Sequence, residues 1–407
     1  MPDDAAAPAT SRSFPDGFTW GTATAAHQVE GGNWNNDWWA WEHAEGTACV
    51  EPSGDACDHF WRYPQDIALL AELGFDNYRF SLEWSRIEPE DGEISRSALD
   101  HYRRMIDACH EHGLRAVVTY HHFTSPRWIT ALGGWEEPVV ADRFGRFAQV
   151  VTEALGDDLD SVCTINEPNV VATVGWLLGA FPPGKQLDVD GRRRVNDVMV
   201  AAHRKAVEAV REVNPNLPVG LTLSMTDYQP VPSDDGDAVA KRDQIRRSME
   251  DVFLDATEGD DFLGVQTYSR ERVGPGGNIG PEEGERVLDM GYEFWPEALE
   301  ATIRRAWTYT KGEVPLIVTE NGIGTTKDEE RVEYVQRALE GVLRCLDDGI
   351  DVRGYTYWSL LDNFEWAFGY VPQFGIVSVD RETQERTLKP SAQWLGQIAR
   401  ANALPVA

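Results

Sequence analysis

The chain has 407 residues, of which 42% are hydrophobic and 26% are charged, proportions that are typical of a folded globular protein. They argue against a disordered or collagen-like chain, and the longest mostly apolar run, residues 170–181, is shorter than the about 20 residues needed to span a bilayer. The formal net charge of −31 argues against nucleic acid and anionic membrane surfaces as partners, because like charges repel.

The first segment of the chain, residues 1–13, is rich in alanine and proline. It has neither a basic start nor an apolar stretch, so we expect a flexible tail rather than a secretory signal. We predict that residues 14–400 form the folded domain and that residues 401–407 are a C-terminal tail. None of the five cysteines forms a Cys-x-x-Cys pair, which is typical of buried thiols in a reducing compartment. The sequence therefore predicts a cytoplasmic protein.

Eight short runs of apolar and β-branched residues recur along the chain, and we predict that each is a strand. Several are nearly continuous apolar runs, as expected for strands that are buried on both faces of a parallel sheet. In chain order they are residues 18–23, 77–82, 115–121, 161–166, 219–224, 262–268, 316–320 and 352–359.

Helical patterns lie between these strands. Residues 97–113 have Ser97 as a cap and Gly113 as a stop, and residues 331–349 carry apolar side chains at helical spacing. Strands that alternate with helices in this way form either a doubly wound sheet or a barrel. Because there are eight units, and no Gly-x-Gly-x-x-Gly motif follows the first strand, we predict a single (β/α)8 TIM barrel.

Six of the predicted strands end in polar or aromatic side chains that a sealed core would leave unpaired. In a (β/α)8 barrel the carboxyl ends of the strands form the face that carries the active site. We therefore expect these residues to surround one pocket: Arg79, His121 with His122, Asn166 with Glu167, Tyr268, Glu320 with Asn321, and Trp358.

Two carboxylates in this set carry the chemistry. Glu167 follows the fourth strand and Glu320 ends the seventh, so the two side chains can face one another across the barrel. Paired carboxylates are the equipment for glycoside hydrolysis, in which one protonates the leaving oxygen and the other attacks or activates water. A metal site is the competing use, but His121 and His122 are adjacent on a strand and point to opposite faces. Only one of them can enter the pocket, and we expect no metal or other cofactor.

Several long motifs occur in one order along nearly the whole chain, from about residue 14 to residue 394. With these motifs the sequence resembles the family 1 glycoside hydrolases, the β-glucosidase family. The motifs are residues 18–31 (FTWGTATAAHQVEG), 78–81 (YRFS), 164–168 (TINEP), 317–322 (IVTENG) and 358–366 (WSLLDNFEW).

The resemblance implies a retaining β-glycosidase with Glu167 as the acid/base and Glu320 as the nucleophile. It implies that Arg79 and Tyr268 contact the nucleophile and keep it ionised, and that Trp358 lies under the sugar ring. A cis peptide bond between Trp358 and Ser359 is implied as well. The residues implied to bind sugar hydroxyls are Gln28, His121, Asn166, Glu365 and Trp366.

The implied substrate is a β-glucoside or β-linked oligosaccharide with a terminal β-D-glucosyl residue, with β-galactosides and β-fucosides also accepted. The carboxylate of Glu365 suits sugar hydroxyls and repels phosphate, so we expect unphosphorylated sugars. The chain departs from the family pattern at Gln266, where asparagine is usual, and at His122, where tryptophan is usual. Tyr292 and Trp295 match the side that faces the leaving group.

Two other functions stay open at this level. One is a transglycosylase, or a glycosidase for a specialised natural product, with the same catalytic residues and a different aglycone pocket. The other is a carbohydrate-binding or receptor-like barrel without catalysis, but relatives of that kind normally lose one of the two carboxylates. Both Glu167 and Glu320 are present, which favours an enzyme. The sequence leaves a homo-oligomer open.

Overall fold

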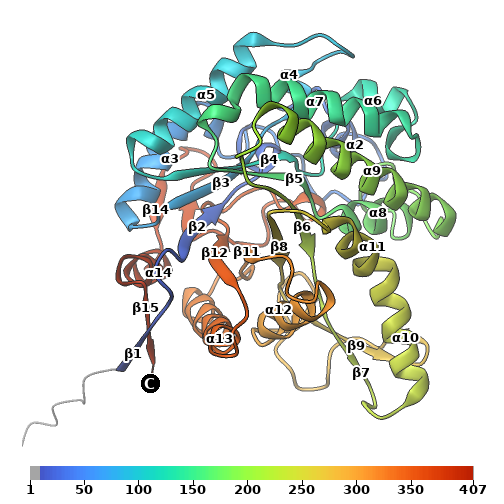
Figure 1. Cartoon of the computed structure of the whole chain (residues 1–407), viewed down its shortest axis with the longest axis vertical. Coiled ribbons are helices and arrows are strands. Elements are labelled where there is room, and N and C mark those ends of the chain that lie inside the picture. Colours follow the sequence, from blue (N-terminus) through green and yellow to red (C-terminus); the bar gives the residue numbers. More distant parts are fainter. Residues whose placement is uncertain (1–9, 407) are drawn as a thin grey trace, which may run out of the picture.

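Eight parallel strands close into a barrel at the centre of the protein, and helices surround it (Figure 1). The computed structural model describes residues 10–406. Each barrel strand pairs with the next one along the chain, and β12 pairs with β2 to close the ring. This architecture confirms the predicted single (β/α)8 barrel. The barrel strands are β2 (Thr19–Ala23), β3 (Asn77–Ser81), β4 (Arg115–His121), β5 (Ser161–Asn166), β6 (Val219–Ser224), β8 (Phe262–Gln266), β11 (Leu316–Asn321) and β12 (Val352–Trp358).

The barrel strands are buried on both sides. Every residue of β3 and of β8 is buried, and β5 and β6 each have only one partly exposed end residue. One face of each strand fills the barrel and the other lies under the helices, so a polar–apolar alternation is not needed. Because of this burial, near-continuous apolar runs in the sequence correctly predicted the strands. The observed strand ends differ from the predicted ends by at most two residues.

A helical segment follows each barrel strand and returns the chain to the other end of the barrel. The longer helices are α3 (His59–Leu73), α5 (Arg96–Glu111), α7 (Val139–Leu155), α9 (Val189–Val213), α10 (Gly236–Arg246), α12 (Ala298–Tyr309), α13 (Asp328–Asp347) and α14 (Pro390–Ala401). The shorter helices are α1 (Ala26–Val29), α2 (Asp37–Glu42), α4 (Trp84–Ile87), α6 (Arg127–Ala131), α8 (Pro168–Trp176) and α11 (Val252–Leu254).

The two helices that the sequence marked most clearly are present with earlier starts. The helix predicted from residue 97 begins at Arg96, because Ser95 rather than Ser97 is the cap: its Oγ accepts from the amide of Ala98 at 3.3 Å. The helix predicted from residue 331 begins at Asp328. Three acidic residues occupy its first turn, where their negative charge interacts favourably with the positive end of the helix dipole.

The first and last described segments of the chain pair with each other. Strands β1 (Thr10–Ser13) and β15 (Ala403–Val406) pair in an antiparallel ribbon and run side by side in Figure 1. The predicted tails, residues 1–13 and 401–407, are therefore wrong over the segments that form this ribbon. Residues 1–9 and 407 lie outside the described part. The register of neither strand is visible in the sequence, because the two partners are almost 400 residues apart.

Two further small sheets decorate the barrel. Strands β7 (Asp227–Pro230), β9 (Arg270–Gly274) and β10 (Gly277–Asn278) form one, and β13 (Val377–Val379) with β14 (Arg386–Leu388) form the other.

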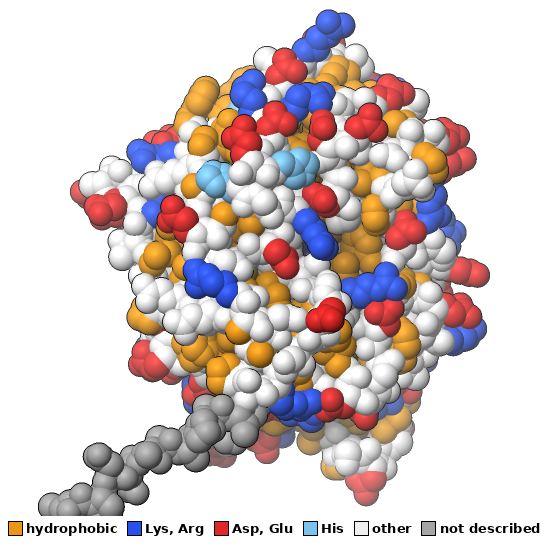
Figure 2. Space-filling model, turned by 60° about the vertical axis from the view of Figure 1, so that its left-hand side comes forward, with side chains coloured by type: hydrophobic (Ala, Val, Ile, Leu, Met, Phe, Trp, Pro, Cys, Tyr) orange, Lys and Arg blue, Asp and Glu red, His pale blue; other side chains and the backbone are white. Residues whose placement is uncertain are grey.

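On the face shown in Figure 2, acidic and basic side chains are interspersed rather than separated into patches of one sign. Within residues 10–406 the structure contains no helix that is both long and apolar enough to cross a bilayer.

Candidate active site

A cavity of about 640 Å³ lies at the carboxyl ends of the barrel strands. Its lining includes side chains that follow six of the eight strands, so it is the pocket that the polar strand ends predicted. The lining includes six polar or charged residues discussed below and seven further aromatic residues: Gln28, His122, Glu167, Tyr268, Glu320 and Glu365, with Phe123, Phe181, Tyr292, Trp358, Trp366, Phe368 and Phe374.

Glu320, on β11, is held from two sides. Arg79 Nη1 donates to its Oε1 at 2.6 Å, and the hydroxyl of Tyr268 donates to its Oε2 at 2.5 Å. Arg79 comes from β3, across the barrel, and it is 1% exposed. Gly322 lets the end of β11 lie against β12, since a Cβ there would stand 2.1 Å from the carbonyl oxygen of Trp358. The carboxylate is therefore charge-paired and fixed in orientation.

Glu167 has a different environment in the same pocket. It precedes α8, its φ is +44°, and its Oε1 is buried without a hydrogen-bond partner among the described residues. Burial raises the pKa of Glu167 well above 4.5, and the nearby charge of Glu320 raises it further, while Arg79 opposes both. Burial and the charge of Glu320 consequently favour the protonated form of this carboxyl group.

Glu365 is a third acid in the pocket. Gln28 Nε2 donates to its Oε2 at 3.2 Å and also to the carbonyl oxygen of Phe364 at 2.8 Å. Burial, followed by the charge of Glu320, raises the pKa of Glu365 to about 8. From the sequence we expected an ionised acceptor at this position. With a pKa of about 8 the group is mostly protonated at pH 7, and among the described residues the buried guanidinium of Arg79 pairs with Glu320 rather than with Glu365.

One sequence-derived assignment is wrong by a single position. His122, not His121, lines the cavity. Asn166 Nδ2 donates to His122 Nε2 at 3.1 Å, and Arg79 Nη2 donates to Asn166 Oδ1 at 2.6 Å. His121 instead contacts Ser125, with Nε2 3.1 Å from its Oγ, and its ring lies on the edge of Trp135.

The strand alternation indicated that only one of the two adjacent histidines enters the pocket, and the family resemblance implied that it is His121, whereas the residue that lines the cavity is His122. Burial lowers the pKa of His122 well below 6.5, and the charge of Arg79 adds to the effect. The His122 ring is therefore neutral at neutral pH. Its Nδ1 is buried without a partner among the described residues, so a hydroxyl group in the cavity can bind there.

Aromatic rings form the floor and one wall of the cavity. The His122 ring is nearly parallel to Trp358 at 5.8 Å and to Trp366 at 6.3 Å between ring centroids. The peptide bond between Trp358 and Ser359 is cis, which confirms the sequence-based expectation. Flat apolar rings beside buried polar groups are suited to the two kinds of surface on a pyranose ring, its C–H faces and its hydroxyl edges.

The outer wall differs in part from what the sequence suggested. Tyr292 and Phe181 line the cavity, as residues on the leaving-group side would. Trp295 does not line it: the guanidinium of Arg270 lies 3.5 Å from its ring centroid. Gln266 is fully buried beneath the site, opposite Glu320 in the strand register, and both of its amide atoms are without partners among the described residues.

The arrangement supplies two carboxyl groups with contrasting surroundings within one buried cavity. Glu320 is paired with a cation, whereas Glu167 is buried without one. Such a pair can donate a proton from one side of a bond and attack from the other. Over residues 10–406 no group of three or more His, Cys, Asp or Glu side chains is arranged to hold a metal ion.

Comparisons with known proteins point to one family. The model of the family described as "Glycosyl hydrolase family 1" matches residues 10–272 and 282–404. A protein of Thermotoga neapolitana named 1,4-beta-D-glucan glucohydrolase is 32% identical, over 97% of this chain and 99% of its own. A protein of Bifidobacterium breve named bifunctional beta-D-glucosidase/beta-D-fucosidase is 33% identical, over 94% of this chain and 97% of its own. The crystal structure of beta-glycosidase BGL167 has a TM-score of 0.86 and 46% identity, and the match covers 97% of this chain and 99% of that one.

Proposed function

The chain belongs to glycosyl hydrolase family 1, and from this premise we propose that it is a retaining β-glucosidase. Its substrate is a β-glucoside or β-linked oligosaccharide, and it releases the terminal non-reducing β-D-glucosyl residue. The single observation that carries the proposal is the contrast between the two carboxyl groups. Glu320 is bound by Arg79 and Tyr268 at 2.6 and 2.5 Å, and Glu167 has a pKa raised by burial.

In the first chemical step Glu320 acts as the nucleophile. One of its carboxylate oxygens forms a bond to the anomeric carbon while the bond from that carbon to the leaving oxygen breaks. The proton of Glu167 passes to the leaving oxygen, so the aglycone departs as a neutral alcohol. The hydrogen bonds from Arg79 and Tyr268 hold the carboxylate in the orientation from which it attacks.

In the second step a water molecule displaces Glu320. The loss of the Glu320 charge on forming the glycosyl ester removes the largest electrostatic cause that raises the pKa of Glu167, so Glu167 becomes a stronger acid and can act as a base once it has lost its proton. It takes a proton from the water, the water oxygen bonds to the anomeric carbon, and Glu320 leaves as a carboxylate. Two inversions restore the original β configuration.

The sugar ring has defined partners in this proposal. Trp358 lies under the ring, and the hydroxyl groups bind to Gln28, His122, Asn166, Glu365 and Trp366. Glu365 is mostly protonated at neutral pH, since burial raises its pKa to about 8, and it can donate to one hydroxyl and accept from another. Such a group can form a hydrogen bond with either an equatorial or an axial 4-hydroxyl. We therefore include β-galactosides and β-fucosides as poorer substrates. The printed activity of the Bifidobacterium breve relative supports the β-fucoside part of this proposal.

The test follows hydrolysis of nitrophenyl β-D-glucoside by NMR, with the anomer of the released sugar recorded before mutarotation. We expect the β anomer first, and we expect Glu320→Gln to abolish turnover because no glycosyl ester can form. Early release of the α anomer would contradict the double-displacement mechanism. Measurable hydrolysis by Glu320→Gln, with the same product anomer, would contradict the assignment of the nucleophile.

A further inference from the structure

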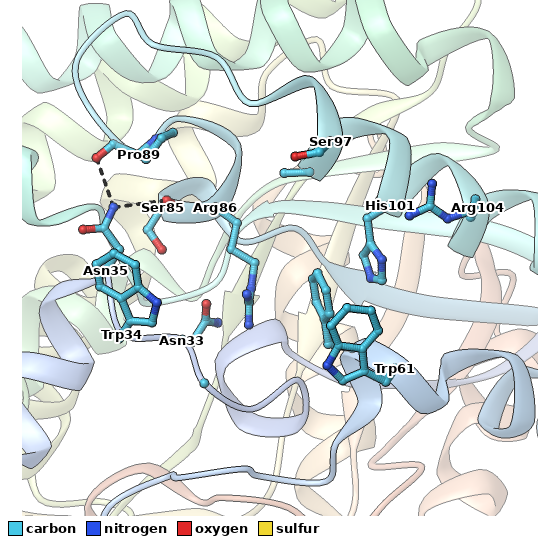
Figure 3. Close-up of a pocket in the computed structure, with 13 residues that line it drawn as sticks. Asn33, Trp34, Asn35, Trp61, Ser85, Arg86, Pro89, Ser97, His101 and Arg104 are labelled. Carbon is cyan, nitrogen blue, oxygen red and sulfur yellow. Dashed lines mark hydrogen bonds between the residues drawn. The ribbon is translucent and has the colours of Figure 1, made fainter.

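A second pocket lies on the outer rim of the barrel and shares no lining residue with the active-site cavity (Figure 3). Its volume is about 430 Å³, which is within the range of about 300–1,000 Å³ that small-molecule sites occupy. One wall is formed by residues 32–35 and 85–89, which follow β2 and β3, and the other by the first turns of α3 and by α5. The pocket therefore opens at the same end of the barrel as the active site.

Two tryptophans are exposed at this pocket. Trp34 is 63% exposed and Trp61 is 74% exposed, and they lie on opposite sides of the pocket in Figure 3. An indole ring that is exposed to water lacks the favourable free energy that a tryptophan side chain usually gains on burial. Exposed aromatic side chains that flank a pocket commonly mark a surface that receives a ligand.

The segment that carries Trp34 is anchored on both sides of it. Asn33 Nδ2 donates to Glu83 Oε2 at 3.0 Å. Asn35 Nδ2 donates to the carbonyl oxygens of Ser85 at 3.3 Å and Pro89 at 3.0 Å, the bonds drawn in Figure 3. The exposed ring therefore stands on a braced backbone, and a ligand that binds it does not have to order the loop.

Buried polar atoms face the same pocket without partners. His101 is 4% exposed and Asn33 is 2% exposed. His101 Nε2 and Asn33 Oδ1 have no hydrogen-bond partner among the described residues. The imidazole is stacked on Phe60, with ring centroids 3.7 Å apart and an angle of 11°. A buried polar atom without a partner is costly, and a ligand hydroxyl at this position would remove the cost.

The charges at the pocket favour a neutral ligand. Burial, together with the charges of Arg104 and Arg86, lowers the pKa of His101 to about 4, so the imidazole is neutral at neutral pH. Arg86 Nε donates to Glu30 Oε2 at 2.8 Å, which balances its charge. None of the described residues that line the pocket carries a carboxylate, and His101 is the single side chain among them of a type that commonly binds metal ions. The net charge of −31 repels anions at long range.

We propose that this pocket is a non-catalytic binding site for a neutral saccharide, with Trp34 and Trp61 packing on the C–H faces of sugar rings. His101 and Asn33 would bind hydroxyl groups between the two tryptophans. The choice of a β-1,4-linked glucan chain as the ligand rests on the proposed function; the saccharide class itself rests on the pocket. Stacking faces with neutral hydrogen-bonding groups between them match a chain that is apolar on its ring faces and polar on its edges.

The test measures binding of cellotetraose with sulfur in place of the bridging oxygens, which resists hydrolysis. Calorimetric titration of the full chain should show two sites. The double variant Trp34→Ala, Trp61→Ala should weaken the outer site by about tenfold or more, as expected for the loss of two aromatic contacts. The kcat/KM for nitrophenyl β-glucoside should not change. Trp39→Ala is the matched control, because Trp39 stacks on His43 outside this pocket and its removal should leave both sites intact.

Other results would overturn the proposal. Unchanged two-site binding in the double variant would show that the tryptophans do not hold the saccharide. A change from dimer to monomer in sedimentation, with unchanged saccharide binding, would show that the patch contacts a second copy of the chain. Saturable binding of inorganic phosphate in place of the saccharide would show an anion site.

The same titration separates this inference from the proposed function. Outer-site binding that the double variant weakens would support the inference even if nitrophenyl β-glucoside were not hydrolysed. A single active-site binding event with normal hydrolysis would overturn the inference and leave the proposed function in place.

Discussion

Replacing Glu365 with glutamine should stabilise the protein at alkaline pH and have little effect in acid. Burial raises the pKa of this carboxyl to about 8 from an ordinary value of 4.5. Below about pH 4.5 the group is protonated in the folded and the unfolded chain alike, so it does not affect the free energy of unfolding. Between pH 4.5 and 8 it ionises only in the unfolded chain, and stability falls. Above pH 8 the loss is complete.

The size of this loss follows from the two pKa values. At about 1.4 kcal/mol for each pH unit, the interval from 4.5 to about 8 corresponds to up to about 5 kcal/mol. Glutamine has no such titration, and its oxygen can still accept the hydrogen bond that Gln28 Nε2 donates. An unfolding entropy of about 2.1 cal/mol/K per residue converts the gain to about 5 °C in Tm for a chain of this length.

The assay is a thermal unfolding scan of wild type and Glu365→Gln at pH 5 and at pH 9. The Tm of the variant should exceed that of wild type by about 5 °C at pH 9, and the difference should nearly vanish at pH 5. Glu258→Gln, at an exposed position, is the control and should show no such pH dependence. An equal difference at both pH values would refute the reasoning, since it would mean that Glu365 titrates alike in the folded and unfolded chains.

Three further outcomes test the catalytic assignments. Glu167→Gln should slow hydrolysis of alkyl β-glucosides far more than that of nitrophenyl β-glucoside. It should also abolish the fall of kcat/KM at alkaline pH, because the acid whose pKa is raised by burial is gone. An equal loss of activity toward both substrates would contradict the proposed role of Glu167. Tyr268→Phe removes the 2.5 Å hydrogen bond to Glu320. This change should lower kcat about 10- to 100-fold, the range expected for a hydrogen bond to a charged group. An unchanged kcat would argue against a role of Tyr268 in holding the nucleophile. His122→Ala should lower kcat/KM at least about tenfold, whereas His121→Ala should lower Tm and leave kcat/KM within about threefold of wild type; the reverse pattern would show that the structure assigns the two histidines wrongly.

Much of the candidate site could be predicted from the sequence because strand ends in a closed parallel barrel converge. Once eight buried runs were recognised, Arg79, Glu167 and Glu320 had to lie at one end of the barrel, and all three meet there. The one-position error at His121 and His122 has a local cause. β4 ends at His121, so the alternation of side chains along a strand gives no information for the next residue.

Protonation states depended on tertiary structure. The motifs around Glu167, Glu320 and Glu365 imply different roles by resemblance, but their neighbours along the chain do not indicate which of the three is paired with a cation. Arg79 reaches Glu320 from β3, 241 positions away, and leaves the other two buried acids without a paired cation. That single contact distinguishes the surroundings of Glu320, our proposed nucleophile, from those of Glu167, our proposed acid/base.

The sequence by itself therefore determined the barrel and its strand positions, because burial on both faces imposes a residue pattern that does not depend on distant contacts. The family followed from the resemblance of its motifs. Tertiary structure alone decided which histidine enters the cavity, that the chain ends pair as β1 and β15, and that Glu365 is mostly protonated at neutral pH. It also decided that Trp34 and Trp61, 27 positions apart in the chain, flank one pocket. Each of these depends on which groups meet in space and how much water reaches them, and sequence spacing carries neither quantity.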